Sequence, residues 1–321
     1  MINSLTPEQL SVLSQTKNIV AEIKKVIIGK DDTIVKVLIA IFAGGHILIE
    51  DIPGVGKTTL ALAFSKALSL DYKRLQFTPD VLPTDVTGFS ILNKDTGKFE
   101  YKEGAAMCNL FLADEINRTS SKTQSSLLEI MEEGKTTVDG VTRNMPKPYI
   151  VIATQNPIGS IGTQMLPESQ LDRFIIRIKM GYPDITSEID MLKSKQSNVP
   201  LDTVISVITA DEIIIAQKII EDVFISDKVF EYIARLAIAT REHPYIKLGI
   251  SPRGTIALTK MAKATALLRG RDYVLPDDVL YTINDVIIHR IILNSKAKLN
   301  GVGAEDIINE IVSKVAIPRI E

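Results

Sequence analysis

The feature of the sequence that most constrains the fold is a glycine-rich stretch that links an apolar segment to a helical pattern. The apolar segment HILIE at residues 46–50 leads directly into DIPGVGKTT at residues 51–59. Apolar residues then recur at helical spacing, at Leu60, Ala63, Phe64, Ala67 and Leu68. Strand, glycine loop and helix in this order form the context of a phosphate-binding loop, in which backbone amides and the helix N-terminus face phosphate groups. The sequence therefore predicts a site for ATP or GTP.

The residues of this P-loop have distinct expected roles. Gly54 and Gly56 let the backbone wrap around phosphates, and Lys57 reaches the terminal phosphates. The Thr58 hydroxyl is expected to ligate Mg²⁺. The usual pattern opens with glycine, whereas this chain has Asp51; we expect an intact loop because the later glycines remain. A glycine-rich turn without a ligand is the alternative. The residues expected to contact the nucleotide here are Pro53, Gly54, Val55, Gly56, Lys57, Thr58 and Thr59.

A second apolar segment, LFLAD at residues 110–114, ends in two adjacent carboxylates, Asp114 and Glu115. Burying two charges at a strand end costs free energy unless a cation or a reaction uses them. We expect Asp114 to hold Mg²⁺ and Glu115 to orient or deprotonate the attacking water in phosphoryl transfer. The alternative is an acidic turn ahead of the helix predicted over residues 121–133.

A third apolar segment, YIVIAT at residues 149–154, runs into Gln155-Asn156-Pro157. If this strand lies between the other two, Asn156 points at the same water as Glu115 and can polarise it without adding charge. The alternative for Asn156 is a turn residue ahead of a proline.

The alternation of strand and helix signals predicts an α/β core followed by a smaller domain. Continuous apolar runs suit parallel strands that helices cover on both faces. We expect the nucleotide-binding core over residues 1–182 and an all-helical lid over residues 183–321, where helical patterns follow Gly181. Strands of the core are expected at residues 46–50, 74–77, 110–114, 149–154 and 174–180.

Composition excludes several classes of protein. The 37 Lys and Arg residues against 39 Asp and Glu give a net charge of -2, so the chain has no global field for nucleic acid or an anionic membrane. The longest apolar stretch, residues 37–49, is interrupted by glycine and histidine and is shorter than the roughly 20 residues of a membrane span. The single cysteine, Cys108, forbids an intramolecular disulfide, and we expect a cytoplasmic protein.

Together these motifs resemble the MoxR family of AAA+ ATPases, from about Ile28 to Phe174. The matching stretches are LIEDIPGVGKT, in which aspartate in place of the first glycine is usual for the family, LQFTPDVLPTDVTG, LADEINRTSSKTQ, ATQNP and LPESQLDRF. The resemblance implies a P-loop AAA+ core with a five-stranded sheet, in which the sensor strand lies beside the P-loop strand. It also implies a hexameric ring that uses ATP to mature or activate partner proteins, often ones with a von Willebrand factor A domain.

The resemblance also assigns roles by position. Asn156 resembles sensor 1, Arg173 of LDRF resembles the arginine finger, and Arg253 of SPRG resembles sensor 2, which would place Arg253 at the nucleotide. An always-charged, bidentate donor suits a transition-state contact. The alternative for Arg173 is an ion pair with Asp172 or Glu168, and for Arg253 a surface position.

The resemblance further implies that Ile28 and Gly29 contact the nucleotide. Two hairpins, expected within residues 91–101 and 135–148, fit the same family and would line a central pore that grips a partner. A two-residue turn at Asp139-Gly140 supports the second hairpin. Surface decoration is the alternative for both.

The leading functional hypothesis is an ATPase that hydrolyses ATP between subunits of a homo-oligomeric ring and remodels protein clients. A nucleic-acid translocase or loader is a second hypothesis, which near-neutral charge and sparse aromatic residues count against. A small-molecule kinase is a third, for which no acceptor pocket is evident. A nucleotide-gated scaffold with little turnover is a fourth, which Glu115 counts against.

Overall fold

A five-stranded parallel sheet forms the centre of the molecule in the computed structural model, which describes residues 5–52, 54–156, 166–196 and 201–319. The strand order is β2-β5-β8-β1-β9. All four neighbouring pairs are parallel, with Ile152 of β8 between Leu112 of β5 and Ile47 of β1. The strands are β1 (His46–Glu50), β2 (Tyr72–Gln76), β5 (Leu110–Asp114), β8 (Ile150–Gln155) and β9 (Phe174–Ile178). The five predicted strands are confirmed. The strand predicted at residues 149–154, which is β8, lies between β1 and β5 as expected.

Helices cover both faces of this sheet, as continuous apolar strands require. Alternate strand residues face opposite sides, so Ile47 and Ile49 pack with α1 to α3 while Leu48 packs with α5. The first helix begins at a capping box formed by Thr6 and Gln9. The helices of this part are α1 (Pro7–Lys24), α2 (Asp31–Phe42), α3 (Lys57–Ala67), α4 (Pro83–Thr87), α5 (Ser121–Glu133) and α6 (Glu168–Leu171), with the 3₁₀ turn η1 (Ile116–Arg118).

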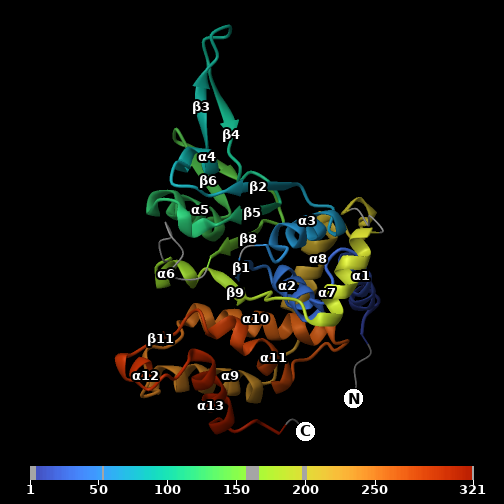
Figure 1. Cartoon of the computed structure of the whole chain (residues 1–321), viewed down its shortest axis with the longest axis vertical. Helices are drawn as coiled ribbons and strands as arrows, with labels where there is room; N and C mark the ends of the chain where they lie inside the picture. Colours follow the sequence, from blue (N-terminus) through green and yellow to red (C-terminus); the bar gives the residue numbers. More distant parts are fainter. Residues whose placement is uncertain (1–4, 53, 157–165, 197–200, 320–321) are drawn as a thin grey trace.

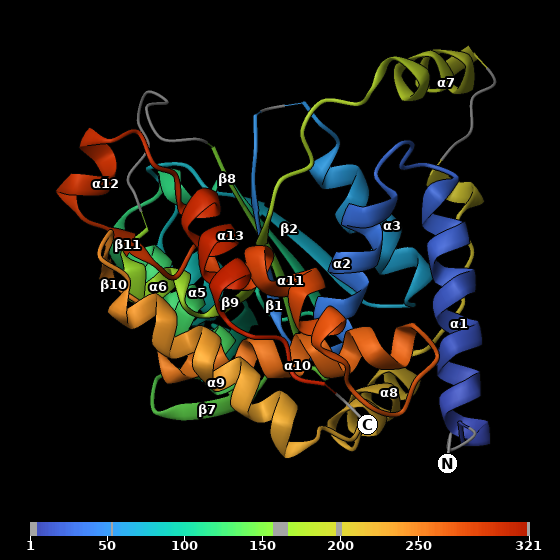
Figure 2. The same cartoon turned by 90° about the horizontal axis from the view of Figure 1, so that it is seen from below.

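The C-terminal part consists mainly of helices. Helices α9 to α13 lie below the sheet in Figure 1, whereas α7 and α8 lie to its right, and Figure 2 shows α7 outside the helices that cover the sheet. The helices are α7 (Ile185–Gln196), α8 (Ala210–Glu221), α9 (Asp227–Glu242), α10 (Pro252–Leu268), α11 (Pro276–Ile287), α12 (Ser295–Leu299) and α13 (Ala304–Lys314), with η2 (Leu201–Thr203). The expectation of a purely helical lid needs one correction, because β10 (Ile246–Leu248) pairs with β11 (Ile292–Leu293). Strands this short carry no sequence periodicity. The domain boundary at residue 182 stays a prediction.

Two antiparallel hairpins interrupt the core. Strands β3 (Gly88–Leu92) and β4 (Phe99–Glu103) form one that stands away from the rest of the molecule (Figure 1). Strands β6 (Lys135–Val138) and β7 (Val141–Asn144) form the other, and its turn has the positive φ values of 51° at Asp139 and 75° at Gly140. The predicted two-residue turn is therefore confirmed. The Arg143 guanidinium lies 3.8 Å from the centre of the Tyr101 ring, so the two hairpins contact each other.

Two further properties concern the described part of the chain as a whole. Within it, no helix combines the length and the apolar character needed to cross a membrane. Cys108 is a free thiol buried in the hydrophobic core just before β5, and burial raises its pKa to about 12.

Candidate functional site

The P-loop connects β1 to α3 in the conformation that glycine permits. Gly54 and Gly56 have φ values of 86° and 92°, a region that other residues rarely adopt. Gly56 is the N-cap residue of α3, so the first turn of that helix presents free backbone amides. Lys57 begins the helix and is buried, with its Nζ donating to the Asp51 carbonyl oxygen at 2.7 Å. Of the predicted loop residues, Pro53 lies outside the described part of the structure.

Asp51, which stands where the usual pattern has glycine, fixes the start of the loop. Its Oδ2 accepts hydrogen bonds from the backbone amides of Met180 and Gly181, both at 2.6 Å. Its Oδ1 accepts from the Ile52 amide at 2.8 Å. The buried carboxylate thus ties the P-loop to the chain just beyond β9.

Substitution of Asp51 by Ala is expected to lower the free energy of unfolding by about 3 kcal/mol, because three buried or half-buried amides lose a charged acceptor. We expect weaker ATP binding as well, since the loop loses its attachment to residues 180–181. Chemical denaturation and nucleotide titration measure the two effects. The exposed residue Asp80 supplies the matched control, Asp80→Ala. An unchanged denaturation midpoint for Asp51→Ala would contradict this role.

Both members of the acidic pair lie at the carboxyl end of β5 and are held by other elements. Asp114 Oδ1 accepts from the Thr154 hydroxyl at 2.6 Å, and Oδ2 accepts from Arg74 Nη2 at 2.7 Å. Thr154 Oγ1 in turn accepts from the Glu115 amide at 2.8 Å. Thr154 of β8 therefore fixes the backbone between the two acids, and Glu115 itself has a φ of 58°.

The Glu115 carboxylate receives hydrogen bonds from three side chains. Arg118 Nη1 donates at 2.9 Å, Asn156 Nδ2 donates at 3.1 Å, and Gln76 contributes a third bond. Partial burial by itself would raise the pKa of Glu115, but these bonds outweigh it and lower the pKa below its ordinary value. Glu115 is therefore an ionised carboxylate at neutral pH, with its oxygens held in place.

One pocket brings together the predicted residues of the P-loop, the acidic pair and the sensor strand. It is lined by Gly54, Gly56, Lys57, Thr58, Thr59, Arg74, Gln76, Asp114, Glu115 and Asn156. Burial lowers the pKa of Lys57, although the nearby charges of Asp51, Asp114 and Glu115 oppose this. A cationic amine, two carboxylates and a helix N-terminus around one polar pocket suit the phosphates of a nucleotide with its cation.

A second, more apolar pocket adjoins the other side of the P-loop. Ile28, Val55, Gly56, Thr59 and Met191 are among the residues that line it. This position suits the base and sugar of the nucleotide, as expected for Ile28. The neighbouring Gly29 has a φ of 71°, and a Cβ there would lie 2.1 Å from Ser187 Oγ. Gly29 therefore allows α7 to pack close to this pocket.

The two arginines of the family resemblance lie together but apart from these pockets. Arg173 Nη1 lies 2.8 Å from Glu132 Oε2 of α5, and Arg253 pairs with the other oxygen of Glu132. Neither arginine is among the residues that line the two pockets beside the P-loop. The alternative for Arg173 was an ion pair with Asp172 or Glu168. In the structure Arg173 pairs with Glu132 instead, and Asp172 pairs with Arg290.

Several residues of the site carry weak sequence signals and were not predicted. Arg74 and Gln76 lie two residues apart on β2, so they share a face, and Gln76 pairs in register with Asp114. The alternation of polar and apolar residues in the segment RLQF at residues 74–77 is the available signal for both. Thr154 and Arg118 were also missed, because a threonine in a strand and an arginine in a loop are common without any such role.

The comparisons with known proteins agree with this geometry. The ATPase family associated with various cellular activities (AAA) matches residues 46–176, and the AAA lid domain matches residues 238–311. Chaperone MoxR1 of Mycobacterium tuberculosis is 35% identical, covering 93% of this chain and 81% of that protein. The uncharacterized protein YeaC of Bacillus subtilis is 49% identical over 93% of both chains.

A solved structure and a further sequence relative support the same family assignment. A crystal structure from Cytophaga hutchinsonii has a TM-score of 0.90 and 39% identity, covering 97% of both chains. Protein MoxR of Methylorubrum extorquens is 31% identical over 85% of this chain and 86% of that protein. Fold, P-loop context and sequence relatives thus coincide, and the chain belongs to the MoxR family of AAA ATPases, enzymes that bind and hydrolyse ATP.

Proposed function

We propose that this ATPase hydrolyses MgATP at the contact between two subunits of a ring, most simply a hexamer, and uses the energy to remodel, mature or activate partner proteins. The observation that carries this proposal is the separation of Arg173 and Arg253 from the pocket of Lys57 and Glu115. If both arginines serve catalysis, they serve the nucleotide of a neighbouring copy. A ring of head-to-tail contacts places them there in every subunit.

The donor set of the pocket fits Mg²⁺ that arrives with the nucleotide. The described residues contain no cluster of three or more His, Cys, Asp or Glu side chains that could hold a metal alone. Mg²⁺ is commonly held by one or two protein oxygens together with phosphate oxygens and water. Thr58 and Asp114 would supply the protein oxygens, and the cation would neutralise charge on the phosphates.

Different residues of the chain bind the phosphates and activate the attacking water. Lys57 and the amides at the start of α3 bind and orient the phosphates. Glu115, ionised and held by Arg118 and Asn156, accepts a hydrogen bond and then the proton from the attacking water. Asn156 fixes the carboxylate so that one oxygen faces that water. The ionised carboxylate of Glu115 in this pocket favours water as the acceptor.

Glu132 gives the two arginines a partner within their own chain. Its side chain is 40% exposed, and its carboxylate contacts both guanidinium groups. An exposed ion pair contributes little stability, so a phosphate of the neighbouring subunit can replace Glu132 at small cost. Both arginines would then face the γ-phosphate as it leaves, where an always-charged bidentate donor stabilises the transition state.

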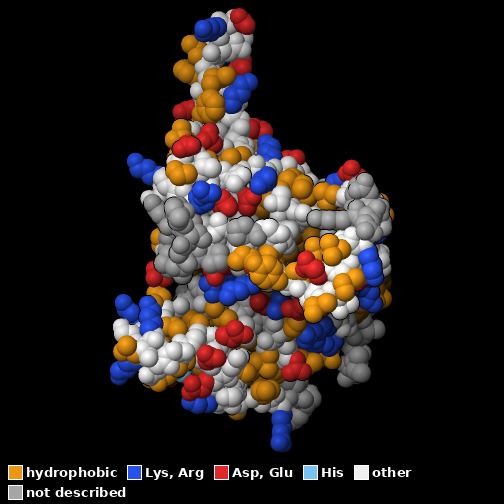
Figure 3. All heavy atoms as spheres, viewed as in Figure 1, with side chains coloured by type: hydrophobic (Ala, Val, Ile, Leu, Met, Phe, Trp, Pro, Cys, Tyr) orange, Lys and Arg blue, Asp and Glu red, His pale blue; other side chains and the backbone are white. Residues whose placement is uncertain are grey.

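The β3–β4 hairpin is the part of the chain best placed to contact a client protein. It projects from the core and exposes apolar side chains, which Figure 3 shows along its length. The exposed fraction of Phe99 reaches 75%, and Phe89, Ile91 and Leu92 are also exposed. Apolar side chains on a projecting element suit contact with unfolded or partly folded protein. Chaperone MoxR1 is the relative whose name supports a protein client, and proteins with a von Willebrand factor A domain are the class we propose.

The concentration dependence of turnover tests the shared site. Phosphate release per subunit is expected to rise with protein concentration and to follow the appearance of rings in analytical ultracentrifugation. A single chain lacks the arginines of a neighbour, which is the physical reason. Lys57→Ala should stay inactive throughout the series. Constant turnover per subunit in samples that sediment as monomers would contradict hydrolysis between subunits.

A further inference from the structure

A buried arginine of the lid contacts the chain on both sides of Arg173. Arg290 lies in the turn after α11, and its side chain is only 2% exposed. Its Nε donates to Asp172 Oδ1 at 2.7 Å. Its Nη2 donates to the Phe174 carbonyl oxygen at 2.6 Å and to the Asp172 carbonyl oxygen at 3.1 Å, and its Nη1 donates to the Ile175 carbonyl oxygen at 3.1 Å. One guanidinium therefore binds the residue before Arg173 and the two residues after it.

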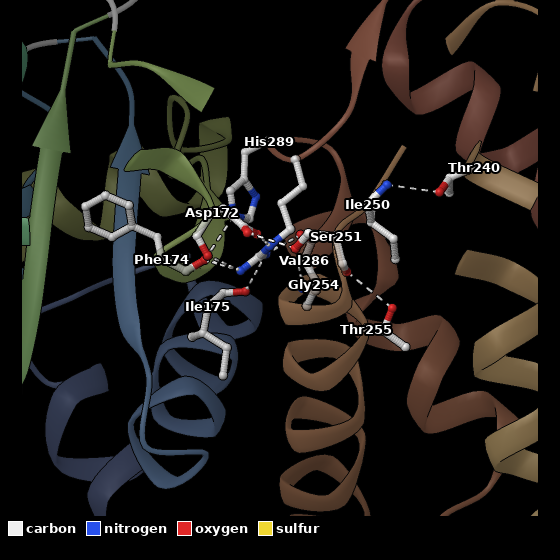
Figure 4. A network of polar contacts seen from close by, with 11 residues as sticks. Asp172, Phe174, Ile175, Thr240, Ile250, Ser251, Gly254, Thr255, Val286 and His289 are labelled. Atoms are coloured by element: carbon white, nitrogen blue, oxygen red, sulfur yellow. Dashed lines mark hydrogen bonds and ion pairs between the residues drawn. The ribbon is translucent and has the colours of Figure 1, made fainter. Parts of the chain in front are cut away.

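The same group of residues fixes the start of the helix that carries Arg253. Ser251 is the N-cap of α10, and its Oγ donates to Asp172 Oδ2 at 2.8 Å. Gly254 follows Arg253 and packs directly on Arg290, so that a Cβ at residue 254 would lie 2.9 Å from Arg290 Cδ. Figure 4 shows Asp172, Phe174 and Ile175 on one side of this network and Ser251 and Gly254 on the other.

We propose that Arg290 is a positioning residue for ATP hydrolysis, which holds Arg173 and Arg253 in one fixed relation so that both reach the nucleotide of the neighbouring subunit. This inference rests on the function proposed above. Arg173 and Arg253 are 80 residues apart and belong to different elements, yet one side chain contacts the residues on both sides of Arg173 and the residue that follows Arg253. A guanidinium can do this because it presents five donors in a rigid plane, whereas the ammonium group of lysine cannot.

Arg290→Lys separates this role from ordinary packing. The variant keeps the charge opposite Asp172 but loses the contacts to the three backbone carbonyls. We expect kcat for ATP to fall about 100-fold, because a misplacement of about 1 Å in a catalytic group can cost that much. Binding of ATP to the variant's own P-loop should be unchanged. The matched control is Arg271→Lys, which weakens another buried ion pair of the lid, with Asp278, and does not touch residues 172–175.

Mixing two inactive variants gives the decisive readout. A Glu115→Gln subunit has correctly placed arginines but cannot hydrolyse the ATP bound to its own P-loop. An Arg290→Lys subunit has a working P-loop site but misplaced arginines. At equal concentrations about a quarter of the contacts then join a working P-loop to working arginines. Phosphate release is expected to return toward that fraction of the wild-type rate. Arg173→Ala mixed with Glu115→Gln should be rescued to the same extent.

Three results would overturn the assignment. If Arg173→Ala is rescued in the mixture and Arg290→Lys is not, Arg290 serves its own subunit. If Arg290→Lys and Arg271→Lys lose equal activity, Arg290 has no special place. If Arg173→Ala is itself not rescued, action between subunits fails, and the role of Arg290 fails with it.

Gly254→Ala provides a second variant that favours the folded helix. Alanine raises the helix propensity of α10, but its methyl group must displace Arg290. We expect a folded protein with lowered kcat, unchanged ATP affinity and rescue by Glu115→Gln. Wild-type turnover of Gly254→Ala would contradict the proposal even if Arg290→Lys could not be purified.

Discussion

Replacement of Glu115 by Gln is expected to lower kcat for ATP hydrolysis by about 10²–10⁴-fold, the usual contribution of a general base. The amide keeps the size of the side chain and its contact with Arg118, but it cannot take a proton from water. ATP affinity should remain, because the phosphates are bound by the P-loop. Steady-state phosphate release and a nucleotide-binding titration measure the two quantities.

The control for this variant is Glu129→Gln, which changes an exposed glutamate of α5 in the same way. Its turnover should equal that of the wild type. If the proposed function holds, the Glu115→Gln protein is also expected to stay in the ATP-bound state and to retain client proteins in a pull-down. If Glu115→Gln hydrolysed ATP at the wild-type rate, the proton acceptor would have to be another group.

Replacement of Arg173 by Ala is expected to cost about 10³–10⁵-fold in kcat, the range found for arginine fingers. ATP binding to the separate chain should not change, since Arg173 does not line the pockets of its own P-loop. Arg173→Lys should recover little, because lysine lacks the planar pair of donors. The measurements are kcat for ATP hydrolysis at protein concentrations at which oligomers form, and ATP affinity at concentrations at which the chains are separate.

Arg235→Ala is the matched control for the loss of an arginine in an ion pair, since Arg235 pairs with Glu231 on the exposed side of α9. It should leave turnover unchanged. Two outcomes would count against the finger: full turnover of Arg173→Ala, or a loss that appears equally in ATP binding by monomers.

The strands and the nucleotide pocket could be predicted because their signals are local. Continuous apolar runs locate β1, β5, β8 and β9 within one or two residues, since buried parallel strands need apolar side chains on both faces. The P-loop and the acids at the end of β5 follow from the chemistry of phosphate and cation binding. The place of the sensor strand beside the P-loop strand was implied by the family resemblance and not by the residues alone.

The connections between elements could not be predicted in the same way. Asp51 was visible as a departure from the usual pattern, but its partners are the backbone amides of Met180 and Gly181, and amides have no sequence signature. The alternative considered for Arg173 was an ion pair with Asp172 or Glu168, which are near in sequence, whereas Glu132 is near only after α5 packs. Arg290 had no signal, because one buried arginine among many exposed ones differs only in its surroundings.

The burial of the Cys108 thiol has a practical benefit for spectroscopy. A group that remains protonated through the physiological range and is shielded from solvent reacts slowly with maleimides, because the thiolate is the nucleophile. A reporter cysteine placed at the tip of the β3–β4 hairpin can therefore carry a fluorophore in the otherwise native chain. In the proposed ring, pairs of dyes on neighbouring tips would report changes in the distance between subunits during each cycle.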